Sequence, residues 1–330
     1  MTTTTAAPPR DIEATIASFT TDLRKLREEI GTMIVGQEKI VEGVLMCLLG
    51  GGHALLEGVP GLGKTMLVRT LAETIHANFS RIQFTPDLMP ADIVGTNVIT
   101  EGEGGAKRFE FQRGPIFANI VLADEINRAT PKTQSALLEA MNEGTVTVEL
   151  ERRTLPQPFM VVATQNPVEY LGTYPLPESQ MDRFLLRLTL GYPEVEEEKM
   201  LLRRGGTERV LAAIPAVLGP EQVLALQEET ERVAVSEALL DYLHALVRAT
   251  RQTAELRLPV STRGAQALFR AVQAYALLHG RAYATPDDAQ AVAEAVLAHR
   301  ILSVSSDGFG AGGREREIVK KILAQVAVPL

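Results

Sequence analysis

Several residue types are scarce in this sequence of 330 residues, and their scarcity argues against disulfide bonds, secretion and membrane insertion. There is one cysteine and no tryptophan, and aromatic residues make up 5% of the chain. One cysteine cannot form an internal disulfide, and the N-terminal segment lacks the basic start and apolar centre of a secretory signal, so a reducing, cytoplasmic location is expected. The longest apolar stretch, residues 43–56, is broken by the glycines 50–52 and by His53. It is too short to span a bilayer, so membrane insertion is not expected.

Basic residues are outnumbered by acidic ones. Lys and Arg total 33 and Asp and Glu total 41, which gives a net charge of −8. Proteins that bind nucleic acid over a wide surface usually carry a basic field and aromatic platforms for the bases, so this composition argues against a nucleic-acid partner. The 45% of hydrophobic residues is typical of a globular protein, and the length suggests about two domains.

The spacing of apolar residues predicts an α/β fold. Helical spacing favours helices over 12–30, ended by Gly31, and over 37–49. Short apolar runs then alternate with helical patterns. The predicted strands are 53–57, 79–84, 119–123, 159–164 and 184–189, and the helices among them are 64–76 and 131–143. This alternation indicates a mostly parallel sheet covered on both faces.

Two interruptions and a change of composition divide the chain. Residues 86–115 form a glycine-rich stretch between two strands, and the alternation in 144–158 predicts a hairpin. Beyond residue 190, Ala, Leu, Glu, Arg and Gln dominate at helical spacing. The helices predicted there are 195–204, 220–233, 236–255, 262–278, 285–298 and 315–326. We therefore expect a flexible tail at 1–10, an αβα domain at 11–190 and a separate all-helical domain at 191–330.

The strongest chemical signal is a glycine-rich loop between a predicted strand and a predicted helix. Residues 58–65 read Gly-Val-Pro-Gly-Leu-Gly-Lys-Thr, which fits the pattern G-x-x-x-x-G-K-[ST]. The glycines let backbone N–H groups surround a phosphate, Lys64 reaches the outer phosphates, and the Thr65 hydroxyl can bind Mg²⁺. The expected nucleotide-binding residues are Gly58, Val59, Pro60, Gly61, Leu62, Gly63, Lys64, Thr65 and Met66.

Polar residues follow two further strands. Asp124 and Glu125 end the apolar run 120–123, at the edge where parallel sheets bind ligands, so Asp124 is expected to hold Mg²⁺ and Glu125 to polarise the attacking water. Asn166 follows the strand 159–164, where an amide can orient that water or simply form a turn before a proline. Together with the loop, these residues predict an ATP site with Mg²⁺.

Five longer segments resemble the MoxR family of AAA+ ATPases. They include the run RIQFTPDLMPADIVGT at 81–96 and the segment GPIFAN that leads into ADEINRA. The others are PKTQSALLEAM at 131–141, ATQNP at 163–167 and GTYPLPE at 172–178. The resemblance covers about residues 30 to 300. It implies an αβα AAA+ P-loop core with a parallel sheet, followed by a helical lid, and assembly into a homo-oligomeric ring that is typically a hexamer.

The resemblance also implies roles for residues that are uninformative by themselves. Asn166 is similar to the sensor 1 residue, and Arg183 to the arginine finger that reaches the ATP of a neighbouring subunit. Arg263 is similar to sensor 2 of the lid, acting on its own or on the adjacent subunit. Val35 and Gly36 resemble the segment that borders the adenine. The stretch at about 86–115 resembles the helix 2 insert and 144–158 the hairpin before sensor 1, both facing the axial channel of the ring, where they could touch substrate.

The function that the resemblance implies is an ATPase that couples hydrolysis of Mg·ATP to remodelling, maturation or metal and cofactor loading of a client protein. A partner with a von Willebrand A domain is expected. Three alternatives stay open. They are a chelatase-like motor subunit, a nucleic-acid motor, and a nucleotide-gated scaffold without hydrolysis, against which the intact Lys64, Asp124 and Glu125 argue.

Overall fold

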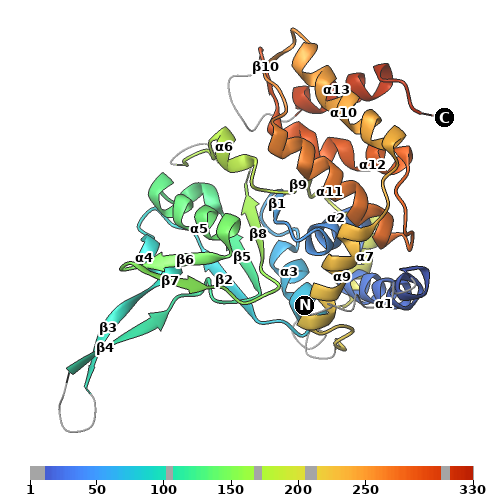
Figure 1. The fold of residues 1–330 in the computed structure, drawn as a ribbon. Coiled ribbons are helices and arrows are strands. Elements are labelled where there is room, and N and C mark those ends of the chain that lie inside the picture. The colour runs from blue at the N-terminus through green and yellow to red at the C-terminus, as the bar shows by residue number, and fades with distance from the viewer. Residues whose placement is uncertain (1–11, 102–106, 167–172, 205–213, 306–312, 330) are drawn as a thin grey trace, which may run out of the picture.

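The computed structural model describes residues 12–101, 107–166, 173–204, 214–305 and 313–329. The tail expected at 1–10 lies outside these residues. Figure 1 shows a sheet with helices around it, a C-terminal helical region and two ribbons that project from the side.

The central sheet has five parallel strands in the order β2-β5-β8-β1-β9. Its strands are β1 (Ala54–Glu57), β2 (Phe79–Gln83), β5 (Ile120–Asp124), β8 (Met160–Gln165) and β9 (Leu186–Thr189). The inner strands β1, β5 and β8 are almost entirely buried, as strands with helices on both faces must be. The sheet confirms the α/β expectation.

Alternate strand residues face two separate cores, because successive side chains of a strand point to opposite faces. In β5, Ile120 and Leu122 pack into one core with β1, the first helices and the C-terminal region. Val121 and Ala123 pack into the other core, on the far face of the sheet. The helices against the first core are α1 (Ile12–Met33), α2 (Glu38–Leu49) and α3 (Lys64–Thr74). Those of the second core are α4 (Pro90–Val94), η1 (Ile126–Arg128), α5 (Pro131–Glu143) and α6 (Glu178–Met181).

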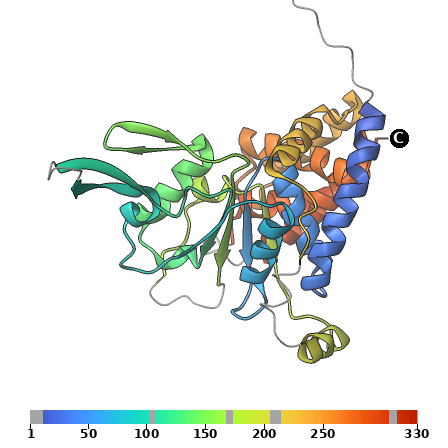
Figure 2. The same cartoon turned by 90° about the horizontal axis from the view of Figure 1, so that it is seen from below.

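Two antiparallel ribbons extend from the second core. One is β3 (Gly95–Glu101) paired with β4 (Lys107–Arg113), and the other is β6 (Thr145–Val148) paired with β7 (Glu151–Thr154). They project from the same side of the sheet, opposite α1 and the C-terminal helices (Figure 2). The second is the expected hairpin. The first lies within the stretch 86–115, for which the sequence predicted no strand, because the residues of β3 and β4 are mostly exposed and show no buried apolar run.

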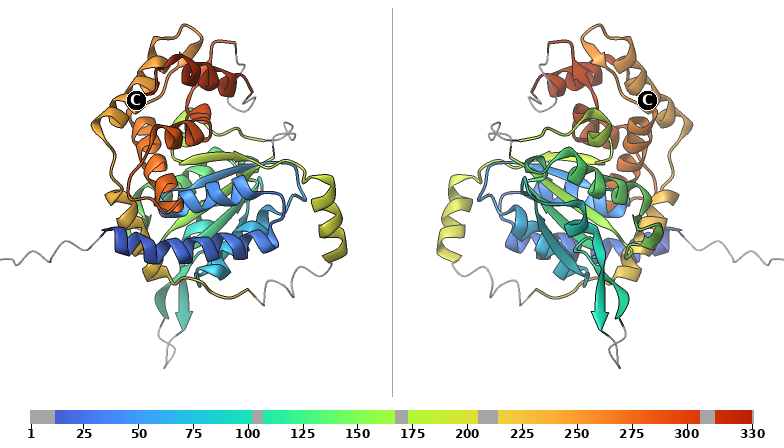
Figure 3. Two further views of the ribbon diagram at one scale, coloured as in Figure 1. Left: turned by 90° about the vertical axis from the view of Figure 1, so that its right-hand side faces the viewer. Right: turned by 90° about the vertical axis from the view of Figure 1, so that its left-hand side faces the viewer.

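The C-terminal region is helical. Its helices are α7 (Val195–Arg204), α9 (Pro220–Arg232), α10 (Glu237–Gln252), α11 (Thr262–Leu278), α12 (Pro286–Leu297), η2 (Ala298–Arg300) and α13 (Gly313–Gln325). Figure 3 shows the later of these helices stacked above one end of the sheet. The region is not all-helical, because β10 (Leu256–Leu258) pairs with β11 (Leu302–Ser303).

The helix ends agree with the expected ones to within a few residues, with one informative error. Gly31 does not end the first helix, because α1 continues to Met33, whose side chain is buried in the core. Burial of an apolar residue beyond the glycine outweighs its low helix propensity of about 1 kcal/mol. Within the described part of the chain, none of the helices combines the length and hydrophobicity that crossing a membrane requires.

Candidate nucleotide-binding site

The glycine-rich loop joins β1 to α3 through two left-handed residues. Gly61 has φ +88° and Gly63, the N-cap of α3, has φ +81°, conformations that side chains rarely adopt. A Cβ on either glycine would meet no atom within 4 Å, so open space faces the loop. Because α3 begins directly at Lys64, the positive end of its dipole and its unpaired N–H groups point to this space. The loop is therefore built to hold an anion.

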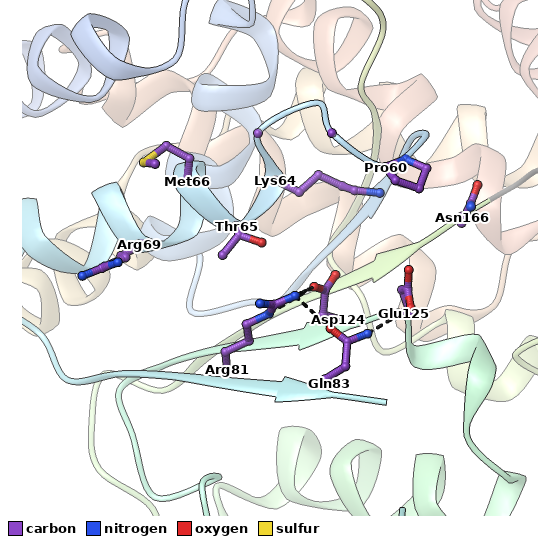
Figure 4. A pocket seen from close by; sticks show the side chains of 12 residues that line it. Pro60, Lys64, Thr65, Met66, Arg69, Arg81, Gln83, Asp124, Glu125 and Asn166 are labelled. Carbon is purple, nitrogen blue, oxygen red and sulfur yellow. Dashed lines mark hydrogen bonds and ion pairs between the residues drawn. The ribbon is translucent and has the colours of Figure 1, made fainter. Parts of the chain in front are cut away.

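Lys64 extends along the loop. Its Nζ donates to the carbonyl oxygen of Gly58 at 2.5 Å, which leaves further ammonium donors for a ligand. Partial burial lowers the pKa of Lys64, while the charges of Asp124 and Glu125 act in the opposite direction. Figure 4 shows Lys64 and Thr65 facing the strand ends that carry both carboxylates. A phosphate in this space would meet a cation on one side and a metal site on the other.

Asp124 is held by a hydroxyl and by a guanidinium. Thr164, fully buried on the neighbouring β8, donates to Asp124 Oδ1 at 2.6 Å. On the other side, Arg81 Nη2 lies 2.6 Å from Asp124 Oδ2, an ion pair with the arginine half-exposed. Arg81 therefore lies against Asp124 Oδ2, an oxygen that could otherwise bind a metal ion.

Glu125 follows the strand in a left-handed conformation, with φ 57° and ψ 49°. Such a backbone is costly for a residue with a side chain and is found preferentially at functional sites. Its N–H donates to Thr164 Oγ1 at 2.8 Å, which stabilises the turn. The carboxylate accepts from Gln83 Nε2 at 2.9 Å and pairs with Arg128 at 3.1 Å. The bent backbone therefore aims Glu125 into the same space as Asp124.

These residues surround a cavity of about 480 Å³. Its lining residues are Pro60, Gly61, Gly63, Lys64, Thr65, Met66, Arg69, Arg81, Gln83, Asp124, Glu125 and Asn166. The structure thus brings Asn166, which is buried beyond the end of β8, together with the loop and both acids. Gly58, Val59 and Leu62 belong to the loop without lining the cavity.

Three lining residues were missed by sequence reasoning. Arg69 lies on α3, and Arg81 and Gln83 are alternate residues of β2. A signal existed in their spacing, because two polar residues at i and i+2 share one face of a strand. Their importance depends on the pairing of β2 with β5, which sets Gln83 opposite Asp124.

Val35 and Gly36 lie away from this cavity. Val35 lines a different cavity beside Met200 and Arg203 of α7. At Gly36 the φ of +75° favours glycine, and a Cβ there would fall 2.1 Å from the Glu197 carboxylate of α7, which would have to move. The expectation that these two residues border an adenine remains a prediction.

Arg183 and Arg263 come together in a second cavity of about 340 Å³, separate from the first. Its lining residues are Gly51, Gly52, His53, Met141, Asn142, Asp182, Arg183, Leu185, Arg263, Gln266, Ala267, Arg270 and Arg300. Arg183 Nη1 donates to the carbonyl of Leu138, and Arg263 Nη2 donates to Asn142 Oδ1 at 2.6 Å. Neither arginine lines the cavity of its own P-loop, and the roles expected for them remain predictions.

The electrostatics of the second cavity favour an anion. Burial lowers the pKa of Arg183, and the positive charge of Arg263 lowers it further. Arg183 Nε is buried without a hydrogen-bond partner. This atom has almost no accessible surface, so the attraction for an anion comes from the positive charges of Arg183 and Arg263, which both line the cavity.

Two family models and several known proteins match this chain. The family "ATPase family associated with various cellular activities (AAA)" matches residues 53–186, and "AAA lid domain" matches residues 248–322. Chaperone MoxR1 of Mycobacterium tuberculosis is 41% identical over 98% of this chain and 86% of its own length. The chain belongs to the MoxR family of AAA+ ATPases. The two matched regions agree with the parallel sheet and the helical C-terminal region, the AAA+ core and lid of this MoxR-family protein.

Further relatives also match over most of their own length and of this chain. Protein YeaC of Bacillus subtilis, which is described as uncharacterised, is 47% identical over 93% of this chain and 95% of its own. Protein MoxR of Paracoccus denitrificans is 30% identical over 88% of this chain and 91% of its own. A crystal structure of a candidate ATPase from Cytophaga hutchinsonii superimposes with a TM-score of 0.86 at 38% identity, covering 96% of this chain and 98% of the other.

The residues present fit Mg²⁺ with a nucleotide. Mg²⁺ is usually held by one or two protein oxygens together with phosphates and waters, and Asp124 and Thr65 supply such a pair beside the loop. Among the residues that the structure describes, no group of three or more His, Cys, Asp and Glu side chains could hold a metal without further ligands. The donor set is therefore one for a metal that arrives with phosphates.

Proposed function

We propose that this MoxR-family protein hydrolyses ATP with Mg²⁺ as a subunit of a homo-oligomeric ring. The observation that carries the proposal is the division of charged groups between two cavities. The loop, Lys64, Asp124 and Glu125 surround the first cavity, whereas Arg183 and Arg263 line the second. Each cavity holds half of the groups that phosphoryl transfer to water requires, so two copies placed with these faces together make a complete site.

In the first cavity each residue has a separate role. The loop and Lys64 bind the phosphates, and Thr65 with Asp124 would hold Mg²⁺, which neutralises charge on them. Glu125 would accept a proton from the attacking water, and Asn166 would orient that water. Since Glu125 is engaged by Gln83 and Arg128, it must exchange these contacts for the water before it can act.

Arg183 and Arg263 would act on the nucleotide of the adjacent subunit, where they stabilise negative charge in the transition state. A hexamer is the ring size that the family resemblance implies. We expect ATPase activity that depends on protein concentration, because dissociation separates the two halves of the site. Phosphate release measured across a dilution series tests this. Constant activity per subunit from ring to monomer would contradict the shared site.

The two ribbons are proposed to contact client protein. Phe109 of β4 is 77% exposed, and Leu150, at the tip between β6 and β7, is 98% exposed with φ 73°. Asn97 Nδ2 donates to Glu149 at 2.5 Å, which joins one ribbon to the other beside this tip. A large apolar side chain held in water by a strained turn does not stabilise the monomer, which favours a role in binding.

The client activity is proposed to be chaperone-like remodelling, maturation, or metal or cofactor loading in the cytoplasm, together with a protein that has a von Willebrand A domain. The experiment is an affinity isolation from native cells with Glu125→Gln held in ATP, which keeps clients bound. The matched control is Lys64→Ala, which lacks the lysine that binds the phosphates of ATP. Recovery of a von Willebrand A protein or a metalloenzyme only with Glu125→Gln supports the proposal. Recovery of its own subunits alone contradicts the client assignment and leaves the ATPase proposal standing.

The alternatives have separate signatures. A chelatase-like motor would be stimulated by a partner that binds a tetrapyrrole. A nucleic-acid motor would be stimulated by DNA, with a steep loss of activity as salt rises. ATP turnover of the purified ring with and without each of these additions distinguishes them.

A further inference from the structure

The segment that carries Arg183 is bound by the C-terminal region. Arg300, from η2, surrounds it with donors. Its Nε donates to Asp182 Oδ1 at 2.8 Å, its Nη1 to the carbonyl of Leu185 at 3.2 Å, and its Nη2 to the carbonyl of Phe184. The Arg300 side chain is 2% exposed, so these charge-assisted bonds are shielded from water. The backbone on both sides of Arg183 is therefore fixed to η2.

The second oxygen of Asp182 leads to the helix of the other arginine. Asp182 Oδ2 accepts from Ser261 Oγ at 3.0 Å. Ser261 is the N-cap of α11, and its hydroxyl also accepts from the N–H of Gly264 at 3.0 Å. Arg263 lies in this first turn of α11. One carboxylate thus connects the segment of Arg183 with the helix turn of Arg263.

Gly264 allows these groups to pack against one another. A Cβ at this position would lie 2.7 Å from Val260 Cγ1 and 2.9 Å from Arg300 Cδ. The close approach lets the Arg300 side chain pass beside the first turn of α11 on its way to Asp182. The turn, the guanidinium and the carboxylate form one packed unit.

Such a unit is needed because the two functional arginines repel each other. Arg183 and Arg263 line the same cavity, and Asp182, the carboxylate among its lining residues, is already engaged by Arg300. Without an anion, two unrestrained guanidinium groups would separate into solvent. Holding them together in advance avoids that reorganisation when an anion arrives, which is how preorganised sites stabilise developing charge.

We propose that Asp182 is a positioning residue that fixes Arg183 and Arg263 in one arrangement, so that both meet the terminal phosphate of a nucleotide held by a neighbouring copy. The inference rests on the proposed function, since it concerns the same shared site. Because Ser261 and Arg300 belong to the C-terminal region, a displacement of that region moves both arginines together. Asp182 touches no phosphate itself and acts through the two arginines.

The first experiment removes one contact of Asp182 by Ser261→Ala. We expect kcat of the ring to fall about tenfold, because a displacement of about 1 Å in a catalytic group can cost more than this. The KM for ATP should change less than about twofold, since the P-loop that binds the nucleotide is untouched. Ser261→Thr, which keeps the hydroxyl, should restore kcat.

The matched control is Ser236→Ala. Ser236 is the N-cap of α10 and accepts from the N–H of Leu239 at 3.2 Å, so its removal costs the same kind of cap without a link to Asp182. Its kcat should equal that of the unchanged protein. If Ser261→Ala and Ser236→Ala lower kcat equally, the effect is that of a lost helix cap and the inference is wrong.

The second experiment places the effect in the neighbouring site. Subunits with Asp182→Asn are mixed with subunits carrying Lys64→Ala, each inactive or weak alone. In a random ring about a quarter of the interfaces then join an intact P-loop to an intact pair of arginines, so activity should rise well above that of either parent. Mixtures of Arg183→Ala with Lys64→Ala provide the reference.

The outcomes separate the inference from the proposed function. Recovery in both mixtures supports the positioning role of Asp182. Recovery with Arg183→Ala but not with Asp182→Asn means that Asp182 supports its own subunit, which overturns the inference and leaves the shared ATPase site intact. Recovery in neither mixture overturns the shared site, and the inference falls with it.

Discussion

The two cavities of this protein differ in how their charged side chains are paired. In the P-loop cavity, Asp124 and Glu125 are each paired with a cation of the same chain, Arg81 and Arg128. In the second cavity, Arg183 contacts a backbone carbonyl and Arg263 a side-chain amide, so the positive charge is left in excess. The difference is that the carboxylates already have cationic partners within the subunit, whereas the arginines have only neutral ones, which is the charge distribution that the proposed shared site needs.

The largest expected effect comes from Arg183→Ala. This variant tests whether an arginine of the second cavity is needed to hydrolyse ATP that is bound in the first cavity of another subunit. We expect kcat for ATP to fall about 10³-fold, as for the loss of an arginine that stabilises a phosphoryl transition state. Nucleotide affinity should be nearly unchanged, since Arg183 does not line the P-loop cavity. Steady-state phosphate release and binding of fluorescent ADP measure the two quantities. Arg248→Ala, an exposed arginine of α10, is the control, and unchanged turnover in Arg183→Ala would contradict the two-cavity arrangement.

The variant Glu125→Gln tests the first cavity with the same two measurements, ATP turnover and nucleotide binding. Loss of the general base should lower kcat about 10²-fold while ATP still binds. The glutamine keeps the size of the side chain, so a change in binding is not expected. Glu221→Gln on the exposed first turn of α9 serves for comparison. Near-normal turnover in Glu125→Gln would remove this residue as the base.

His53 belongs to the second cavity, and the prediction for it concerns the stability of the fold. It precedes β1 and lines the second cavity, where Nδ1 accepts from the N–H of Val161 and Nε2 lies 3.0 Å from the carbonyl of Met141. Burial lowers the pKa of His53 to about 4. The unfolded chain, with a histidine pKa near 6.5, binds the proton first as pH falls. His53 therefore costs no stability above pH 6.5 and destabilises the fold progressively between pH 6.5 and 4.

At pH 5 this penalty is roughly 2 kcal/mol, or about 30-fold in the unfolding equilibrium. Urea unfolding at pH 7 and pH 5 measures it. His53→Gln should unfold with a shallower dependence on pH, although it is less stable at pH 7 because it loses buried contacts. His244→Gln, on the exposed face of α10, should keep the full dependence. Burial also lowers the pKa of His299, so part of the pH dependence should remain in His53→Gln. Equal slopes in both variants would mean that His53 does not contribute to it.

The smallest expected effect is that of Arg81→Ala on Mg²⁺ binding. The half-exposed ion pair between Arg81 and Asp124 must open before Asp124 can reach a metal, and such pairs contribute about 1 kcal/mol or less. We expect the Mg²⁺ concentration for half-maximal binding of fluorescent ADP to fall up to about fivefold. Arg128→Ala, which removes the partner of Glu125 instead, should leave this concentration unchanged. A rise in the required Mg²⁺ would show that Arg81 assists the metal site.

Local sequence was enough for the strands of the central sheet, for the longer helices, and for the P-loop and the two carboxylates of the first cavity. The P-loop could be read directly, because its glycines, Lys64 and Thr65 are contiguous and their conformation depends on neighbours in the chain. The same holds for Asp124 and Glu125, which end a strand of four apolar residues. The parts that were missed, β3, β4 and the short β10 and β11, are exposed or short, so they lack the buried apolar run that marks a strand.

The sequence by itself determined that an anion-binding loop and two carboxylates meet at one end of a parallel sheet, since each motif fixes its own backbone. Tertiary structure alone decided that Arg81 and Gln83 join them, through the pairing of β2 with β5. It also decided that Arg183 and Arg263 share a second cavity. The same cavity holds the partly buried bond between Asp182 and Arg300, which lie 118 positions apart in the chain. Contacts at such separation form only when the core and the helical region pack together, and no local pattern encodes them.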